Sequence, residues 1–236
     1  MNVLYAVFVS LISLGSAVAS AQSNPVVVEL FTSQGCSSCP PADRFMHDLA
    51  KREDVIALAL HVDYWDYIGW KDEFADPAYA RRQKGYARVA GHRMVSTPQM
   101  IVNGSDDVVG ARSMELAELI MTHKMQPDHA RIRGVITEQT ARIVAEPIAP
   151  LQASPLDVLL VRYDPERTVR IKSGENAGRE IRYVNTVREW TVIGQWDGVA
   201  PTEMNVPITG DRPTVVLVQV RKPSGPGPIV AAAKLE

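Results

Sequence analysis

Two runs of apolar residues, separated by an amphipathic segment, dominate the first part of the chain. Residues 26–31 are mostly β-branched or apolar and predict a strand buried on both faces, and residues 55–62 predict a second one. Between them, Phe45, Met46 and Leu49 give one apolar face to a predicted helix. Strand, helix and strand at this spacing predict a β-α-β unit with parallel strands and a right-handed crossover.

Turn and capping residues continue this pattern to about residue 126. Asp76 and the proline after it predict the start of a helix that runs to about Val89. Residues 98–103 predict a third strand, followed by a hairpin turn into a fourth. Ser113 is the expected cap of a closing helix. The expected order of elements is therefore β-α-β-α-β-β-α.

The pattern of apolar and polar residues changes from about Pro127. Short runs with β-propensity alternate with Pro, Gly, Asn and Asp, and no long helical pattern follows. The clearest runs are Val158–Tyr163, Arg182–Val187 and Val215–Val220. We therefore expect an α/β domain over residues 22–126 and a separate β-rich, sandwich-like domain over residues 127–236.

The N-terminus carries the pattern of a signal peptide. Residues 3–14 form an apolar run of the length of an h-region, and Ala17-Val18-Ala19 or Ala19-Ser20-Ala21 fits a cleavage site. No Lys or Arg precedes the run, and the alternative is a buried N-terminal strand or helix. The pattern predicts a signal peptide over residues 1–21 and a periplasmic or secreted protein. No later stretch is long and apolar enough to predict a membrane span.

Composition narrows the classes of function. The formal net charge is −2, and charges of both signs are mixed along the chain. The sequence therefore lacks the cluster of basic residues that is typical of proteins that bind nucleic acid or an anionic membrane. The chain has 2 cysteines, Cys36 and Cys39. A bridge over so short a loop stabilises a fold by only about 2 kcal/mol, so chemistry explains the pair better than stapling does.

A C-x-x-C motif at the start of a helix suits reversible disulfide chemistry. The helix dipole stabilises a thiolate at the helix N-terminus and lowers the pKa of the thiol. Cys36 would then be the attacking thiol, and Cys39 the thiol that resolves a mixed disulfide. Placement after a buried strand of a β-α-β unit favours redox chemistry over the alternatives, metal binding and an inert bridge.

The second motif, Ser96-Thr97-Pro98, directly precedes the third strand. Together with the cysteine pair, it resembles the thioredoxin superfamily. That resemblance implies a thioredoxin-like fold for residues 22–126, a cis bond before Pro98, and Thr97 as the neighbour that faces the substrate. The alternative is an ordinary trans proline at the first residue of a strand.

Glu29 is a polar residue in an otherwise apolar strand. The resemblance to thioredoxins implies a buried acid beneath the resolving cysteine, so Glu29 could act as a base towards Cys39 with its pKa raised by burial. The alternative is an ion pair with a Lys or Arg at the sheet edge.

Residues 61–71 gather aromatic and acidic side chains at the end of a strand. Trp65 and Trp70 could line a substrate groove, with His61 tuning the thiols, or they could pack against the β-rich domain. This segment and the C-S-S-C-P-P-A-D run resemble a thioredoxin-like family of bacterial secreted proteins that has no established substrate. Residues 174–179 resemble the C-terminal part of that family, although their composition alone predicts a turn or loop.

Two functions remain at this stage. The first is an exported thiol–disulfide oxidoreductase without a cofactor, which acts on a protein or small-molecule disulfide or thiol and needs a redox partner to recycle it. The second is a Cu(I)-binding or copper-carrier protein, with Cys36, Cys39 and His61 as candidate ligands.

Overall fold

The computed structural model describes residues 24–149, 151 and 155–235, so the expected signal peptide lies outside the described residues. The helices are α1 (Pro40–Leu49), the short 3₁₀ helix η1 (Asp66–Ile68), α2 (Pro77–Val89) and α3 (Ser113–Lys124). The strands are β1 (Val26–Thr32), β2 (Val55–His61), β3 (Gln99–Val102), β4 (Asp106–Val109), β5 (Ala130–Thr137), β6 (Thr140–Pro147), β7 (Leu156–Arg170), β8 (Glu180–Trp196), β9 (Thr202–Pro207), β10 (Thr214–Lys222) and β11 (Gly225–Leu235). The order expected for residues 22–126 is confirmed.

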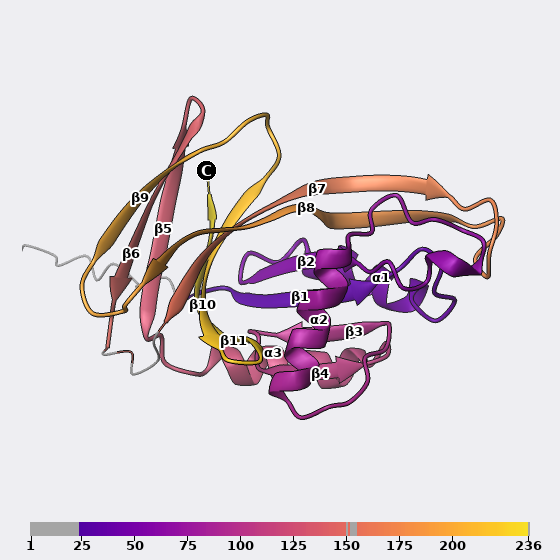
Figure 1. Cartoon of the computed structure of the whole chain (residues 1–236), viewed down its shortest axis with the longest axis horizontal. Coiled ribbons are helices and arrows are strands. Elements are labelled where there is room, and N and C mark those ends of the chain that lie inside the picture. Colours follow the sequence, from indigo (N-terminus) through magenta and orange to yellow (C-terminus); the bar gives the residue numbers. More distant parts are fainter. Residues whose placement is uncertain (1–23, 150, 152–154, 236) are drawn as a thin grey trace, which may run out of the picture.

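One 8-stranded mixed sheet runs through the molecule (Figure 1). Its strand order is β11-β10-β7-β8-β2-β1-β3-β4, and a 3-stranded sheet, β5-β6-β9, packs at one end. β1 and β2 are parallel and joined through α1, whereas β3 and β4 are antiparallel to their neighbours. Strands from both halves of the chain thus share one sheet.

This sheet shows that the expected fold class, a thioredoxin-like α/β domain followed by a separate β-rich domain, is wrong. β8 adds to the outer edge of β2, where Thr186 pairs with Ala59. β2 is buried along its whole length, so its free edge would otherwise expose backbone groups beside a buried strand. Alternation of apolar and polar residues identified the C-terminal strands, but it does not specify which sheet they join.

The side chains of β1 divide between two cores, as expected for a buried strand. Val28 and Leu30 pack towards α1 and α3, and Val27 and Phe31 pack towards α2. A third core fills the space between the two sheets, with Trp196 among its members. Helices therefore cover both faces of the large sheet around β1, with α1 and α3 on one face and α2 on the other.

Most of the residues expected at the starts of helices lie there in the structure. Asp76 caps α2, and its carboxylate accepts a hydrogen bond of 2.7 Å from the backbone N–H of Ala78. Pro40 and Pro41 lie in the first turn of α1, as expected. The expected cap at Ser113 is wrong, because α3 begins at Ser113 itself and Arg112 precedes it without a side-chain cap.

The hairpin of β7 and β8 extends beyond the rest of the sheet. β7 is 15 residues long, but β10 pairs with it only as far as Arg162. Residues 163–187, which we call the arm, pass over α1 and the loop after β1 (Figure 1). The arm brings the C-terminal half of the chain to the cysteines.

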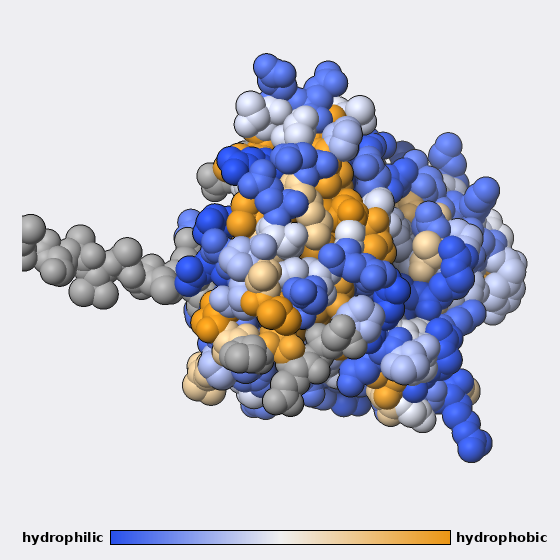
Figure 2. All heavy atoms as spheres, turned by 60° about the vertical axis from the view of Figure 1, so that its left-hand side comes forward, coloured by the Kyte–Doolittle hydropathy of each residue, from blue (hydrophilic) through white to orange (hydrophobic). Residues whose placement is uncertain are grey.

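The opposite end of the molecule is formed by the small sheet. With that end turned forward, apolar side chains gather in patches between polar ones (Figure 2). Within the residues that the structure describes, no helix has the length and apolarity needed to cross a membrane.

Candidate active site

The two cysteines lie between β1 and α1. Cys36 and Cys39 form a disulfide with a Cα–Cα distance of 5.4 Å. Cys39 is the residue directly before α1, so the bridge is located at the helix N-terminus, as expected. Both cysteines are fully buried, whereas Ser37 and Ser38 between them are exposed. The bridge is therefore reached through the two serines.

The Thr97–Pro98 peptide bond is cis, as expected. Cys36 Sγ lies 3.7 Å from the Thr97 carbonyl oxygen and 3.3 Å from Ser38 Oγ. The Ser38 hydroxyl also donates to the Thr97 carbonyl oxygen over 3.3 Å. The structure thus brings the cysteine loop and the segment before β3 into contact. The roles assigned to Pro98 and Thr97 stay predictions.

Two tryptophans flank the cysteine loop. Trp65 Nε1 donates to Thr97 Oγ1 over 2.7 Å, and Trp70 Nε1 donates to Gln34 Oε1 over 2.7 Å. Trp70 also packs against Ile171 and other apolar residues of the arm. The packing alternative therefore describes Trp70, and a substrate-binding role for either tryptophan stays a prediction.

A buried carboxyl group lies one helical turn after Cys39. The backbone N–H of Asp43 donates to the Cys39 carbonyl oxygen over 3.1 Å, and Thr32 Oγ1 donates to Asp43 Oδ1 over 2.8 Å. Burial raises the pKa of Asp43 to about 7, although the nearby charge of His61 acts in the opposite direction. Asp43 Oδ2 has no hydrogen-bond partner among the described residues. This group can therefore take up or release a proton near neutral pH.

A histidine–aspartate pair completes the buried polar region. His61 Nδ1 lies 2.7 Å from Asp72 Oδ2, and both side chains are buried. Burial alone would raise the pKa of Asp72, but the charge and hydrogen bond of His61 lower the pKa overall. His61 Nε2 and the hydroxyl oxygens of Tyr183 and Thr186 have no hydrogen-bond partner in the described part of the chain. Buried atoms of this kind are costly in a purely structural core.

Glu29 does not join this group. Its side chain lies on the α2 face of the sheet, where Arg82 donates to both carboxylate oxygens over 2.6 and 2.9 Å. The Tyr86 hydroxyl donates to Glu29 Oε1 as well, over 2.5 Å. The structure therefore gives Glu29 the ion pair of the alternative interpretation, although Arg82 comes from α2 and not from a sheet edge. A role for Glu29 as a base towards Cys39 has no support from these contacts.

The arm contributes a residue that the sequence reasoning missed. Asn176 is buried at the tip of the arm, and its side-chain N–H groups donate to the carbonyl oxygens of Gln34 and Cys36, each over 2.9 Å. The sequence marked this stretch only as a turn or loop. Asp43 was also missed, although its spacing of four residues from Cys39 on a predicted helix was a usable signal.

The described residues do not form the ligand cluster that the alternative function, Cu(I) binding, would need. Within residues 24–149, 151 and 155–235, no group of three or more His, Cys, Asp or Glu side chains is arranged to hold a metal ion. Cys36 and Cys39 are bonded to each other, and His61 is paired with Asp72.

Comparison with known proteins places this chain in a family. No curated protein matches it. Among solved structures, protein AGR_C_4864 from Agrobacterium tumefaciens is 32% identical with a TM-score of 0.77, and the match covers 91% of this chain and 96% of that one. HBP35 of Porphyromonas gingivalis is 15% identical with a TM-score of 0.63 over 89% of this chain and 74% of that one, which concerns the fold alone. A family model matches residues 27–219, and the chain belongs to the family described as "Protein of unknown function (DUF1223)".

Proposed function

We propose that this protein is an exported thiol–disulfide oxidoreductase whose redox-active pair is Cys36 and Cys39. The observation that carries the proposal is the contact between a disulfide at a helix N-terminus and the cis-proline segment, with Cys36 Sγ 3.7 Å from the Thr97 carbonyl oxygen. The resemblance of these motifs to the thioredoxin superfamily supports the same chemistry. The signal-peptide pattern of residues 1–21 supports a periplasmic or secreted location.

Cys36 is the attacking residue in this proposal. In the reduced protein, the positive end of the α1 dipole stabilises its thiolate, and the Ser38 hydroxyl, 3.3 Å from Cys36 Sγ, can turn its proton from the Thr97 carbonyl oxygen to the sulfur. The thiolate attacks one sulfur of a substrate disulfide, which forms a mixed disulfide and releases the other sulfur as a thiolate. The carbonyl group of Thr97 offers the substrate backbone an acceptor beside the reacting sulfur.

Cys39 resolves the mixed disulfide. Its thiol loses a proton, its sulfur attacks Cys36 Sγ, and the bond to the substrate breaks. Asp43 is the candidate proton acceptor, since its carboxyl group is buried one turn from Cys39 with a pKa of about 7, and its Oδ2 has no hydrogen-bond partner among the residues that the structure describes. Two electrons pass to the substrate disulfide, and the protein returns to the bridged form. The reverse sequence oxidises a substrate dithiol.

Trapping of the mixed disulfide tests these assignments. Cys39→Ser leaves the attacking thiolate without a resolving partner, so we expect it to accumulate a covalent adduct with a peptide disulfide. Cys36→Ser is the matched control and should form far less adduct, because Cys36 is the cysteine that lies against the Thr97 carbonyl oxygen, where the substrate backbone would bind. Non-reducing gel electrophoresis and intact-mass measurement count the adducts. Equal adduct yields, or none in either variant, would contradict the proposed roles.

A further inference from the structure

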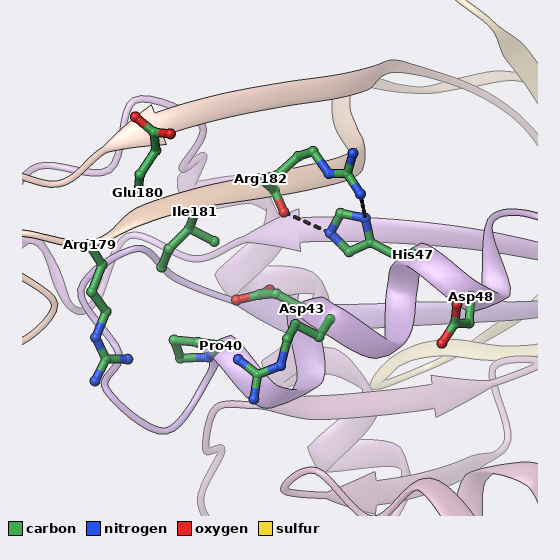
Figure 3. A pocket seen from close by; sticks show the side chains of 9 residues that line it. Pro40, Asp43, His47, Asp48, Arg179, Glu180, Ile181 and Arg182 are labelled. Carbon is green, nitrogen blue, oxygen red and sulfur yellow. Dashed lines mark hydrogen bonds between the residues drawn. The ribbon is translucent and has the colours of Figure 1, made fainter.

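A groove runs between α1 and the arm (Figure 3). Its volume is about 800 Å³. Its lining residues are Pro40, Asp43, Arg44, His47, Asp48, Arg179, Glu180, Ile181 and Arg182. Pro40 directly follows Cys39, so the groove opens next to the redox-active pair and not at a remote surface.

Two cationic side chains line the groove and have no ion-pair partner among the described residues. Arg44 projects from the middle of α1, and Arg179, from the last residues of the arm tip, lies at the end of the groove beside Pro40 (Figure 3). Both are exposed, and neither forms an ion pair with an acidic side chain of the described residues. A guanidinium presents several N–H donors in a fork that matches a carboxylate. Two such groups on opposite walls suit an anionic ligand.

The acidic residues of the lining do not neutralise this end. Asp48 lies at the far end of the groove and pairs with Lys51 over 3.2 Å. Glu180 points away from α1, across the strand (Figure 3). Asp43 is buried beneath the groove, and its raised pKa of about 7 leaves it only partly charged at neutral pH. The groove is therefore positive where it meets the cysteines.

The length of the groove fits an extended peptide. Pro40 and Asp48 are eight residues apart on or beside α1, which corresponds to about 12 Å along a helix axis. An extended chain advances about 3.3 Å per residue, so three or four peptide residues fill this length. Arg182 and His47 are in contact across the groove, with Arg182 Nη2 3.2 Å from His47 Nδ1, and this contact fixes the spacing of its walls.

From these observations we propose that the groove binds a short acidic segment of a substrate protein, next to the cysteine that reacts with Cys36. The inference rests on the proposed redox function and adds the class of substrate. Arg44 and Arg179 donate hydrogen bonds to carboxylates of that segment while the substrate disulfide lies at Cys36. Electrostatic attraction at this end would act mainly on the rate of association.

Two matched peptide disulfides test the inference. Each carries one intramolecular disulfide, flanked in one peptide by Asp and Glu and in the other by Lys. The protein, residues 22–236, is reduced with dithiothreitol and desalted, and the rate of peptide reduction is measured under second-order conditions. We expect the acidic peptide to react about tenfold faster at low salt, with the difference shrinking as ionic strength rises.

Charge-reversing substitutions test whether Arg44 and Arg179 cause the preference for the acidic peptide. Arg44→Glu combined with Arg179→Glu should abolish or invert the preference. Arg131→Glu, an exposed arginine on the small sheet, is the control and should keep it. Hydroxyethyl disulfide, an uncharged substrate, reports the intrinsic reactivity of Cys36 and should react equally with all variants.

Two results would overturn the inference, and they are distinguishable. Equal rates for both peptides, with hydroxyethyl disulfide still reduced, would reject the acidic groove and leave the redox function standing. Failure to reduce any of the three disulfides would reject the redox function and the groove with it.

Discussion

Asp43 shows at the scale of a single residue how burial changes a side chain's chemistry. Its pKa is about 7 in the folded chain and 3.8 in the reference state. Between these values the folded chain binds more protons than the unfolded chain, so stability falls as the pH rises from about 4 to 7. Above pH 7 the loss is complete, on the order of 4 kcal/mol.

Asp43→Asn removes this dependence on pH. We expect the variant to be more stable than the parent at pH 8 by a few kcal/mol and to differ little at pH 3, where Asp43 is mostly protonated in both states. Denaturant unfolding at the two pH values measures the difference. Asp48→Asn, on the exposed side of α1, is the control and should show no such change. An Asp43→Asn variant with the parent's pH dependence would show that Asp43 is not the titrating group.

Glu29 offers the opposite test, because its contacts are structural. Glu29→Gln leaves Arg82 with an uncompensated buried charge and should cost about 3–5 kcal/mol of stability. We expect the reduction potential of the cysteine pair and the rate of mixed-disulfide resolution to stay unchanged. A double variant, Glu29→Met with Arg82→Met, removes both charges and keeps the test available if the single variant does not fold. Slower resolution in both variants would restore Glu29 as the base.

Some residues of the candidate site could be predicted from the sequence. Cys36, Cys39 and Pro98 carry local signals, and the structure brings them together. The acid was assigned to Glu29, although the four-residue spacing of Asp43 from Cys39 on the predicted helix was a usable signal. The structure separates the two: Asp43 is on α1, and Glu29 faces α2 across the sheet.

The arm is the element whose place the sequence pattern could not predict. Its strands read as ordinary β-runs, but β7 and β8 are 15 and 17 residues long and extend past the rest of the sheet. Asn176 lies at the tip, in a stretch that the sequence marked only as a turn or loop. Its two hydrogen bonds reach the carbonyl oxygens of Gln34 and Cys36, which are about 140 residues away along the chain. No local sequence pattern predicts a contact between residues so far apart in the chain.

Asn176→Ala tests whether the arm holds the cysteine loop. Loss of two buried hydrogen bonds should lower the free energy of unfolding by about 2 kcal/mol. We also expect dithiothreitol to reduce the Cys36–Cys39 disulfide several-fold faster, because the loop that covers it loses a contact. Ser173→Ala is the control, since its hydroxyl donates to Gly69 and does not touch the cysteine loop. Equal reduction rates in the two variants would show that the arm does not restrain the disulfide.

At the scale of the whole molecule, the shared sheet predicts that the chain unfolds as one unit. β8 of the C-terminal half adds to β2 of the N-terminal half, so neither half keeps the whole sheet without the other. We expect a single transition with equal calorimetric and van't Hoff enthalpies for residues 22–236. Two separate transitions would instead support the division at residue 126 that the change in sequence texture suggested.

A redox titration decides whether Cys36 and Cys39 cycle between thiol and disulfide. The protein is equilibrated across a series of glutathione buffers, free thiols are trapped, and their number is counted by mass. We predict a reversible transition between about −270 and −120 mV. A pair that stays bridged below about −300 mV would contradict it and identify a structural disulfide.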